Sequence, residues 1–220
     1  AGSTLSSFDA LQGGETLTMT GSGTAASANV ANGIAMSSNG NLALADGTGA
    51  ASNYSLNSTV INVTQRPISV SGTRLYDATT NAVASDLSTH ANLVGSETLT
   101  LSGTGTIASK DVGSNKTVSV GTLALGNGSN GGLAANYTLS GGTHQLTVNR
   151  RPLNATLARQ YDGTTAAAGS TLSAFDALQG GETLTLSGSG TAASANVANG
   201  IAMSSNGNLA LVNGTGAASN

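Results

Sequence analysis

Two histidines, His90 and His144, and ten carboxylates are the side chains here best suited to acid–base or metal chemistry. The carboxylates are scattered singly along the chain, at Asp9, Glu15, Asp46, Asp77, Asp86, Glu97, Asp111, Asp162, Asp176 and Glu182. No two of them lie within three residues of each other, so the alternating Asp spacing of a calcium loop is absent. With no Cys, thiolate metal sites and disulfides are also excluded. We therefore predict no catalytic residues, no metal site and no cofactor, and we do not expect an enzyme.

Two kinds of side chain carry alternative interpretations. Asp77 and Asp162 could each supply one metal ligand, but an Asp in this position more often caps its own turn, which is the interpretation favoured here. The tyrosines could form a platform on which sugars stack. Because they recur at fixed positions relative to the predicted strands, we interpret them instead as core anchors. They are Tyr54, Tyr76, Tyr137 and Tyr161.

Eight Asn-x-Ser/Thr sequons occur, a number that chance explains in a chain so rich in Asn, Ser and Thr, so glycosylation is not predicted. They lie at Asn53, Asn57, Asn62, Asn115, Asn127, Asn136, Asn154 and Asn213.

The overall composition excludes several classes of protein. Only 8% of residues are charged, the net charge is −3 and the mean hydropathy is +0.04, which does not fit a disordered chain. The seven Lys and Arg residues do not cluster beyond Arg150-Arg151, which argues against nucleic acid as a partner. No apolar run approaches the length of a membrane helix. No signal-peptide pattern opens the chain, so we expect a fragment whose export signal and membrane anchor lie elsewhere.

An internal repeat organises the sequence. Residues 1–53 recur as residues 168–220 with five differences, which are Ser7/Ala174, Met19/Leu186, Thr20/Ser187, Ala45/Val212 and Asp46/Asn213. A more divergent copy lies between them: Arg66-Pro67 recurs as Arg151-Pro152 after 85 residues, and Glu97 follows Glu15 after 82. The repeat is therefore about 82–85 residues long, which suits a small domain better than one coil of a solenoid.

These offsets predict three modules. Residues 66–150 form a complete module, residues 1–65 a partial one without its N-terminal strand, and residues 151–220 a partial one without its C-terminal strands. Pro fixes φ and restricts the preceding residue, so the joints at Arg66-Pro67 and Arg151-Pro152 should be short and stiff, with modules in line and few contacts between them. Residues 54–64 and the third module are expected to be able to pair between chains.

Alternation of apolar and polar residues predicts short half-buried strands. It is clear over residues 16–20, 68–70, 98–101, 117–120 and 145–148. Residues 24–32 are Ala-rich and could form a helical turn. The predicted fold is all-β: a tandem array of β-sandwich-like domains of about 83 residues that forms an elongated rod, with β-grasp-like modules or a β-solenoid as alternatives. The predicted core residues are Tyr76, Leu99, Leu101, Val118, Val120, Tyr137, Leu146 and Val148.

The phased motifs resemble a known family. Tyr161-Asp162-Gly163-Thr164-Thr165, the Glu-Thr-Leu-Thr-Leu-Ser-Gly run at residues 97–103, Asn136-Tyr137 and the restart at Arg151-Pro152 are together similar to the YDG, or mostly-beta glycine-rich, repeat. That repeat occurs in large bacterial surface exoproteins of the filamentous haemagglutinin type, including biofilm adhesins exported by two-partner secretion.

The resemblance implies a role in cell adhesion: a stalk, on the bacterial outer-membrane surface, that projects an adhesive tip for attachment in biofilm. The expected partners are neighbouring modules of the same array, without nucleic acid. As an alternative, the repeats themselves bind exopolysaccharide or the same adhesin on other cells. Two departures stand out: Ala78 replaces the glycine of the motif, where it would be strained if that glycine has a positive φ, and Arg74 and Arg159 stand near the place of a frequent lysine.

The divergent middle module separates the two near-identical copies. Similar neighbours can exchange strands, and His90 in place of Phe8 and Phe175 would make an exchanged segment fit badly. We predict that the alternation limits such exchange.

Overall fold

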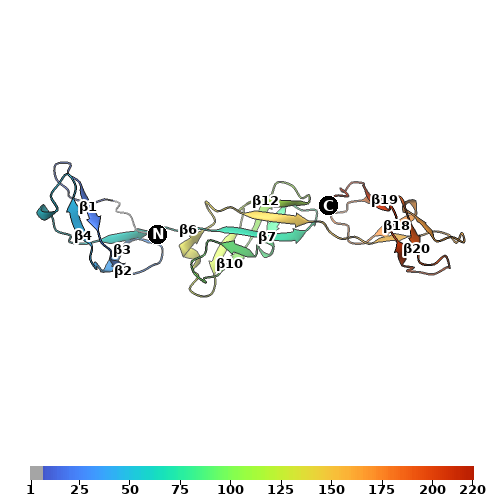
Figure 1. The fold of residues 1–220 in the computed structure, drawn as a ribbon, viewed down its shortest axis with the longest axis horizontal. Helices are drawn as coiled ribbons and strands as arrows, with labels where there is room; N and C mark the ends of the chain where they lie inside the picture. The colour runs from blue at the N-terminus through green and yellow to red at the C-terminus, as the bar shows by residue number, and fades with distance from the viewer. Residues whose placement is uncertain (1–6) are drawn as a thin grey trace.

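The computed structural model describes residues 7–220 and shows three β modules that follow one another along the long axis of the molecule (Figure 1). Within these residues the only helical segments are four three-residue 3-10 turns: η1 (Ala51–Asn53), η2 (Ala84–Asp86), η3 (Ala134–Asn136) and η4 (Gly169–Thr171). The predicted all-β fold is confirmed. No helix in this part of the chain has the length and apolar character needed to cross a bilayer.

The first module is built from two small sheets. Its strands are β1 (Leu17–Thr20), β2 (Thr24–Ala25), β3 (Ala31–Ser38), β4 (Ala43–Asp46) and β5 (Val60–Val63). Strand β1 pairs with β4, and β3 lies between β2 and β5, all antiparallel. The long strand β3 is therefore paired along both edges.

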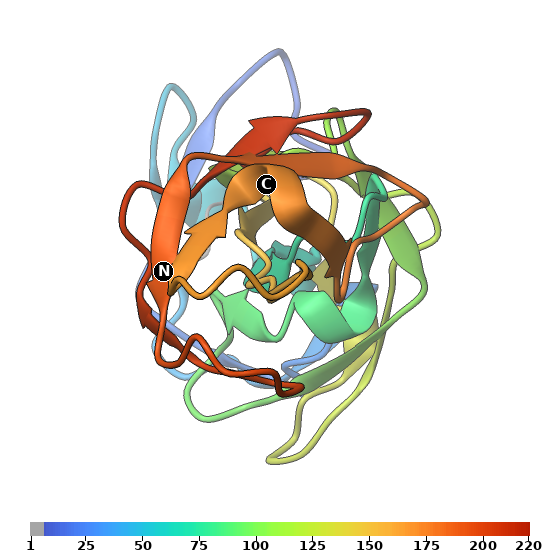
Figure 2. The same ribbon diagram turned by 90° about the vertical axis from the view of Figure 1, so that its right-hand side faces the viewer.

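The middle module centres on one six-stranded sheet in the order β8-β11-β12-β15-β7-β9, which curls when seen down the long axis (Figure 2). Its strands are β6 (Arg66–Pro67), β7 (Ser69–Leu75), β8 (Asn81–Val83), β9 (Thr89–Ala91), β10 (Leu99–Ser102), β11 (Thr104–Ile107), β12 (Gly113–Ser119), β13 (Ala124–Asn127), β14 (Tyr137–Thr138) and β15 (Gln145–Asn149). The first and last long strands, β7 and β15, pair in parallel. The polypeptide thus closes the middle module by placing its last strand beside its first long strand.

The third module has seven strands among the described residues, which correspond to β7 through β13 of the middle module. They are β16 (Ala155–Leu157), β17 (Ala166–Ala168), β18 (Leu172–Phe175), β19 (Leu184–Ser187), β20 (Ser189–Ala192), β21 (Met203–Ser205) and β22 (Ala210–Asn213). Strand β16 pairs with β18, β19 pairs with β22, and β20 lies between β17 and β21. The C-terminus of the chain lies at the joint with the middle module (Figure 1).

The middle module holds the largest core, which lies between its curled sheet and the β10–β13 ribbon. Six of the predicted core residues are buried there, and Leu101 and Val120 pack against them while partly exposed. The buried six are Tyr76, Leu99, Val118, Tyr137, Leu146 and Val148. The prediction from alternation is thus confirmed, with Ile68, Val70, Leu87 and Ile107 as further members.

Residues 24–32 do not form a helical turn. The structure instead has strand β2 at Thr24–Ala25, and then a bend in which the Ser27 hydroxyl accepts a hydrogen bond from the backbone N–H of Asn29 at 3.1 Å. Serine side chains that bond the local backbone compete with helix formation. The Ala content of the segment is therefore outweighed by its polar residues.

Candidate functional site: the joints between modules

Both histidines lie beside Val70 of strand β7. His144 is buried; its Nδ1 accepts the backbone N–H of Val70 at 3.3 Å, and its Nε2 lies 2.9 Å from the carbonyl oxygen of Leu139, which identifies Nε2 as the protonated nitrogen. This imidazole, which lies directly before β15, links β7 to Leu139, the residue that follows β14. His90 pairs with Val70 on strand β9, and burial lowers its pKa. Within residues 7–220, no group of three or more His, Asp and Glu residues is arranged to hold a metal ion.

The two Asp of the Tyr-Asp motif cap their turns, as predicted. The Asp77 carboxylate accepts the backbone N–H of Thr79 at 2.9 Å, and Asp162 accepts that of Thr164 at 2.9 Å. Each carboxylate also forms an ion pair with the arginine three residues earlier, Arg74 or Arg159. The Arg159 guanidinium holds the pKa of Asp162 at about 2, with help from Thr164.

Ala78 adopts the strained conformation expected for it. Its φ is 63°, close to the 73° of Gly163 at the same repeat position, so the turn is preserved rather than rearranged. A residue with a Cβ in this left-handed region is disfavoured by roughly 1–2 kcal/mol. The middle module keeps the turn because Ala78 packs against its core and Asp77 and Arg74 fix both ends of the turn.

Each glutamate of the repeated Glu-Thr motif accepts a hydrogen bond from a tyrosine hydroxyl. Tyr54 bonds Glu15 at 2.6 Å within the first module, and Tyr137 bonds Glu97 within the middle one. In the third module, Glu182 bonds Tyr76, which belongs to the middle module. The Glu–Tyr pair thus closes a module internally in two cases and crosses the joint in the third.

The joint between the first and middle modules is held by the side chain of Asn136. Its Oδ1 accepts the backbone N–H of Val30 at 2.9 Å, and its Nδ2 donates to Oδ1 of Asn29 at 3.0 Å. Asn29 and Val30 lie in the turn that Ser27 stabilises at the end of the first module. One amide side chain therefore satisfies a backbone donor and a side-chain acceptor of the neighbouring module.

The joint between the middle and third modules uses the same arrangement. Asn220 accepts the backbone N–H of Val112 at 3.1 Å and donates to Asp111 at 3.0 Å, while Ser109 stabilises the turn as Ser27 does. The hydroxyl of Ser109 and then the Asn220 amide lower the pKa of Asp111. We call this pattern, in which Asn136 or Asn220 holds the Ser-x-Asn/Asp-Val turn of the preceding module, the asparagine clasp.

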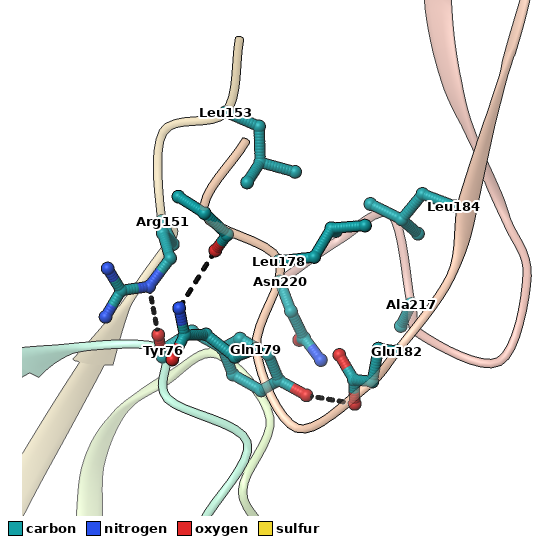
Figure 3. A pocket seen from close by; sticks show the side chains of 10 residues that line it. Tyr76, Arg151, Leu153, Leu178, Gln179, Glu182, Leu184, Ala217 and Asn220 are labelled. Atoms are coloured by element: carbon teal, nitrogen blue, oxygen red, sulfur yellow. Dashed lines mark hydrogen bonds between the residues drawn. The ribbon is translucent and has the colours of Figure 1, made fainter. Parts of the chain in front are cut away.

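Residues at or next to the two Arg-Pro steps form hydrogen bonds with the backbone that carries each clasp asparagine. Gln65 donates through Nε2 to the carbonyl oxygen of Ala135, and at the next joint Arg150 donates through Nε to that of Ser219, at 3.2 and 3.0 Å. Arg151 donates to the carbonyl oxygen of Tyr76 at 2.6 Å (Figure 3). Its backbone N–H donates to the carbonyl oxygen of Asn220 at 3.0 Å. The backbone that carries the clasp asparagine is thus tied to the joint itself.

The second joint carries an additional polar cluster around the Tyr76 hydroxyl. Tyr76 donates to Glu182 (Figure 3), Lys110 forms an ion pair with the same carboxylate, and the Lys110 Nζ lies 5.8 Å from the centre of the Tyr76 ring. The Lys110 ammonium, followed by the Tyr76 hydroxyl, lowers the pKa of Glu182, and that carboxylate in turn raises the pKa of Lys110. Burial, and then Glu182, raises the pKa of Tyr76.

The space left in this joint is too small for a ligand. The cavity between Tyr76, Arg151, Leu178 and Glu182 has a volume of about 20 Å³, room for roughly one water molecule, whereas small-molecule sites are typically about 300–1,000 Å³. The arrangement is therefore suited to holding two modules together rather than to binding a small molecule between them.

The expectation of short joints with few contacts did not include these residues. The sequence pattern marks Asn136 only as part of a repeated Asn-Tyr pair, and it assigns no role to Asn29, Asp111 or Asn220. A signal was present, because a Ser-x-Asn/Asp-Val turn recurs at Ser27, Ser109 and Ser194, always about 26 residues before an Asn that ends a module segment. Which side chains meet across a joint depends on the module orientation, which the repeat pattern does not define.

Comparison with protein families gives one match. The family described as the YDG domain matches residues 62–147 and again residues 143–220, which together cover most of the chain. No curated protein and no solved structure matches it. The two matched ranges begin at residues 62 and 143, before Arg66-Pro67 and Arg151-Pro152, which lie at the joints.

Proposed function

The chain belongs to the YDG-domain family, and on that premise we propose that it is part of a structural stalk, which projects an adhesive tip from a bacterial surface for attachment in biofilm. The observation that carries the proposal is the asparagine clasp: at both joints an Asn side chain accepts a backbone N–H of the preceding module and donates to an Asn or Asp side chain of the same turn. Joints that share this clasp would hold successive modules in a similar relative orientation, so that length grows in proportion to module number. A stalk needs this property, and an enzyme does not.

Electrostatics supports the same role. Only 8% of the residues are charged, and residues 7–220 contain three ion pairs between side chains. Salt screens exposed charges strongly but affects neutral hydrogen bonds and apolar packing much less. The asparagine clasp of the first joint involves only neutral groups, which suits a rod exposed to surroundings of varying ionic strength.

The alternative, in which the repeats themselves bind polysaccharide, draws less support from the tyrosines. Tyr76 and Tyr137 are buried in the middle module, with 4% and 3% of their surface exposed, so their rings are not open to a sugar. The prediction that the tyrosines are core anchors is wrong for Tyr161, which is 66% exposed, but a single ring offers no extended platform.

Low-angle scattering on the whole chain tests the proposal. The wild-type chain should scatter as a stiff rod of three modules, and the doubly substituted Asn136→Ala, Asn220→Ala chain should show a broader distribution of maximum dimensions. Each substitution removes two hydrogen bonds across a joint, and a net hydrogen bond stabilises by about 0.5–1.5 kcal/mol.

The matched control is Asn53→Ala, which changes the same repeat position where the side chain is exposed. This variant should scatter like the wild type. A wild-type chain that already samples bent conformations as broadly as the double variant would contradict a stalk built on rigid joints.

A further inference from the structure

The polypeptide enters and leaves the middle module through strands that lie side by side. It enters from the first joint along β6 and β7, and it leaves toward the second joint along β15. Strands β7 and β15 pair in parallel, from Ser71 opposite Gln145 to Leu75 opposite Asn149. The entry and exit points therefore lie at opposite ends of one parallel ladder, and β7 runs along the long axis of the molecule (Figure 1).

A pull on the two neighbouring modules acts on this ladder in shear. It draws β7 back toward the first module and β15 forward toward the third, along the direction of the strands. The hydrogen bonds of a parallel pair are evenly spaced, so sliding one strand past the other strains all of them at the same time. In an antiparallel hairpin pulled at its two ends, the bonds would instead break one after another.

The parallel contact extends beyond β7 and β15 at both ends. Before β7, strand β6 pairs in parallel with β14, and the N–H of Ile68 donates to the carbonyl oxygen of Thr138 at 3.0 Å. After β7, the N–H of Tyr76 donates to the carbonyl oxygen of Asn149 at 2.9 Å. The entering strand is thus bonded to β14 and β15 along its length.

Two side chains bridge the break between β14 and β15, where residues 139–142 leave the ladder. The hydroxyl of Ser69 accepts the backbone N–H of Thr143 at 2.9 Å. The Nδ1 atom of His144 accepts the backbone N–H of Val70 at 3.3 Å. Side-chain bonds therefore take the place of backbone bonds at this point, and His144 is a rung of the ladder.

Both long strands of the ladder lie inside the sheet and in the core. Strand β15 lies between β12 and β7, and β7 lies between β15 and β9, so neither is an edge strand that could peel away. Four of the five largest fully buried side chains of the described residues are on or next to these strands: Ile68, Val70, Leu146 and Val148. Hydrogen bonds are electrostatically stronger in such an interior than in water, and water reaches them only once the strands separate.

We propose that the middle module carries tension along the rod, with the parallel ladder of β6 and β7 against β14 and β15 as a shear clamp. The purpose of the clamp rests on the proposed stalk, because a stalk that holds an attached cell is pulled at both ends. The two proposals fail separately. A module that unfolds at low force would leave the rod-like scattering unchanged, and flexible joints would leave the unfolding force of the module unchanged.

The direction of pulling tests the clamp, and attachment points can be chosen freely because the sequence has no Cys. In the whole chain, Thr64→Cys with Asn149→Cys loads the ladder in shear. The matched control, Thr64→Cys with Thr143→Cys, pulls on the same end of both strands and peels them apart. All three positions are exposed.

Both variants are pulled in optical tweezers at one loading rate. The shear variant should unfold at a force at least about twofold higher than the control, because its evenly spaced bonds break together. An added length of at most roughly 300 Å, at about 3.5 Å per residue, identifies the event as unfolding of this module. Equal unfolding forces in the two variants would overturn the proposal.

A substitution at His144 tests its place in the clamp. His144→Phe keeps a ring of similar size and removes the bond to Val70, so it should lower the force of the shear variant. The control is Ile107→Ala, which opens a cavity at a buried residue of β11, outside the clamp, and should lower the melting temperature at least as much with a smaller loss of force. His144→Gln, whose amide can both accept and donate, should restore part of the force. A larger loss of force in Ile107→Ala than in His144→Phe would overturn the role assigned to His144.

Discussion

The same eight residues, Ala-Asn-Gly-Ile-Ala-Met-Ser-Ser, occur in the first module as Ala31–Ser38 and in the third as residues 198–205. In the first module all eight form strand β3, and in the third only Met203–Ser205 do, as strand β21. Ile34 is 9% exposed and paired with Ile61, whereas Ile201 is part of no strand. Because the local sequence is identical, the difference comes from the neighbouring strand.

This comparison shows that strand length in these modules is set by pairing rather than by propensity. Gly, Asn, Ala and Ser are poor strand formers, so the segment extends only where β5 supplies hydrogen bonds and apolar contacts. The same principle applies at the joints, where an Asn of one module completes the turn of the preceding one. Strand β5 and the clasp asparagines thus stabilise segments whose own sequence does not determine their conformation.

The substitution with the largest expected effect, Tyr137→Ala, opens the core of the middle module. Tyr137 is 3% exposed and bonded to Glu97, so Tyr137→Ala removes a core anchor and leaves that carboxylate without its tyrosine. Replacing a buried aromatic by Ala typically costs about 3–5 kcal/mol, enough to unfold a module of this size, as thermal denaturation would register. Tyr161→Ala is the control, since Tyr161 is 66% exposed; equal losses in both variants would contradict the assignment of Tyr137 to the core.

A substitution with a smaller expected effect weakens strand β5, on which the comparison of β3 with β21 depends. Ile61→Ala on β5 removes half-buried apolar contacts with Ile34, at a cost of about 1–2 kcal/mol, less than at a fully buried site. Hydrogen exchange of β3 should accelerate. Ile201→Ala, which changes the equivalent of Ile34 in the third module, should leave exchange rates in β3 unaltered, and a similar acceleration in both variants would argue against β5 as the cause.

A third substitution, His90→Phe, gives the middle module the residue type that the outer modules have at Phe8 and Phe175. Burial lowers the pKa of His90, so the unfolded chain binds the proton more tightly. The stabilisation is complete above the unfolded pKa of about 6.5 and is lost as pH falls through the folded value. His90→Phe should remove this dependence, and melting temperatures at pH 7.5 and 5 measure it; the lowered pKa of Asp162, about 2, places its own titration at much lower pH. An identical fall in both chains would exclude His90 as the source.

The smallest expected effect concerns the turn that Ala78 and Gly163 share. Ala78→Gly relieves a left-handed alanine at φ 63° and should stabilise the middle module by at most about 1 kcal/mol, because packing of the Ala78 methyl group is lost. The reverse change, Gly163→Ala, should destabilise the third module. Chemical denaturation of both variants checks the signs, and a destabilising Ala78→Gly would show that packing outweighs strain.

Several of these features could be predicted from the sequence, because they depend on local pattern. Alternation at Leu99 and Val118 identified the core, Asp77 before Thr-Thr identified a turn cap, and the glycine of the motif identified the strain at Ala78. The parallel pairing of β7 with β15 could not be predicted, since it joins strands about 75 residues apart. The asparagine clasp depends on the orientation of two modules, and the unequal lengths of β3 and β21 have no local cause.

Hydrogen exchange on the wild-type chain tests most directly whether strand formation here requires a partner strand. The two identical segments can be distinguished by mass in peptides that extend to Ala45 or Val212, where the copies differ. At concentrations low enough to keep the chain monomeric, the amides of residues 33–36 should exchange at least about tenfold more slowly than those of residues 200–203. Equal exchange rates in the two segments would contradict the account.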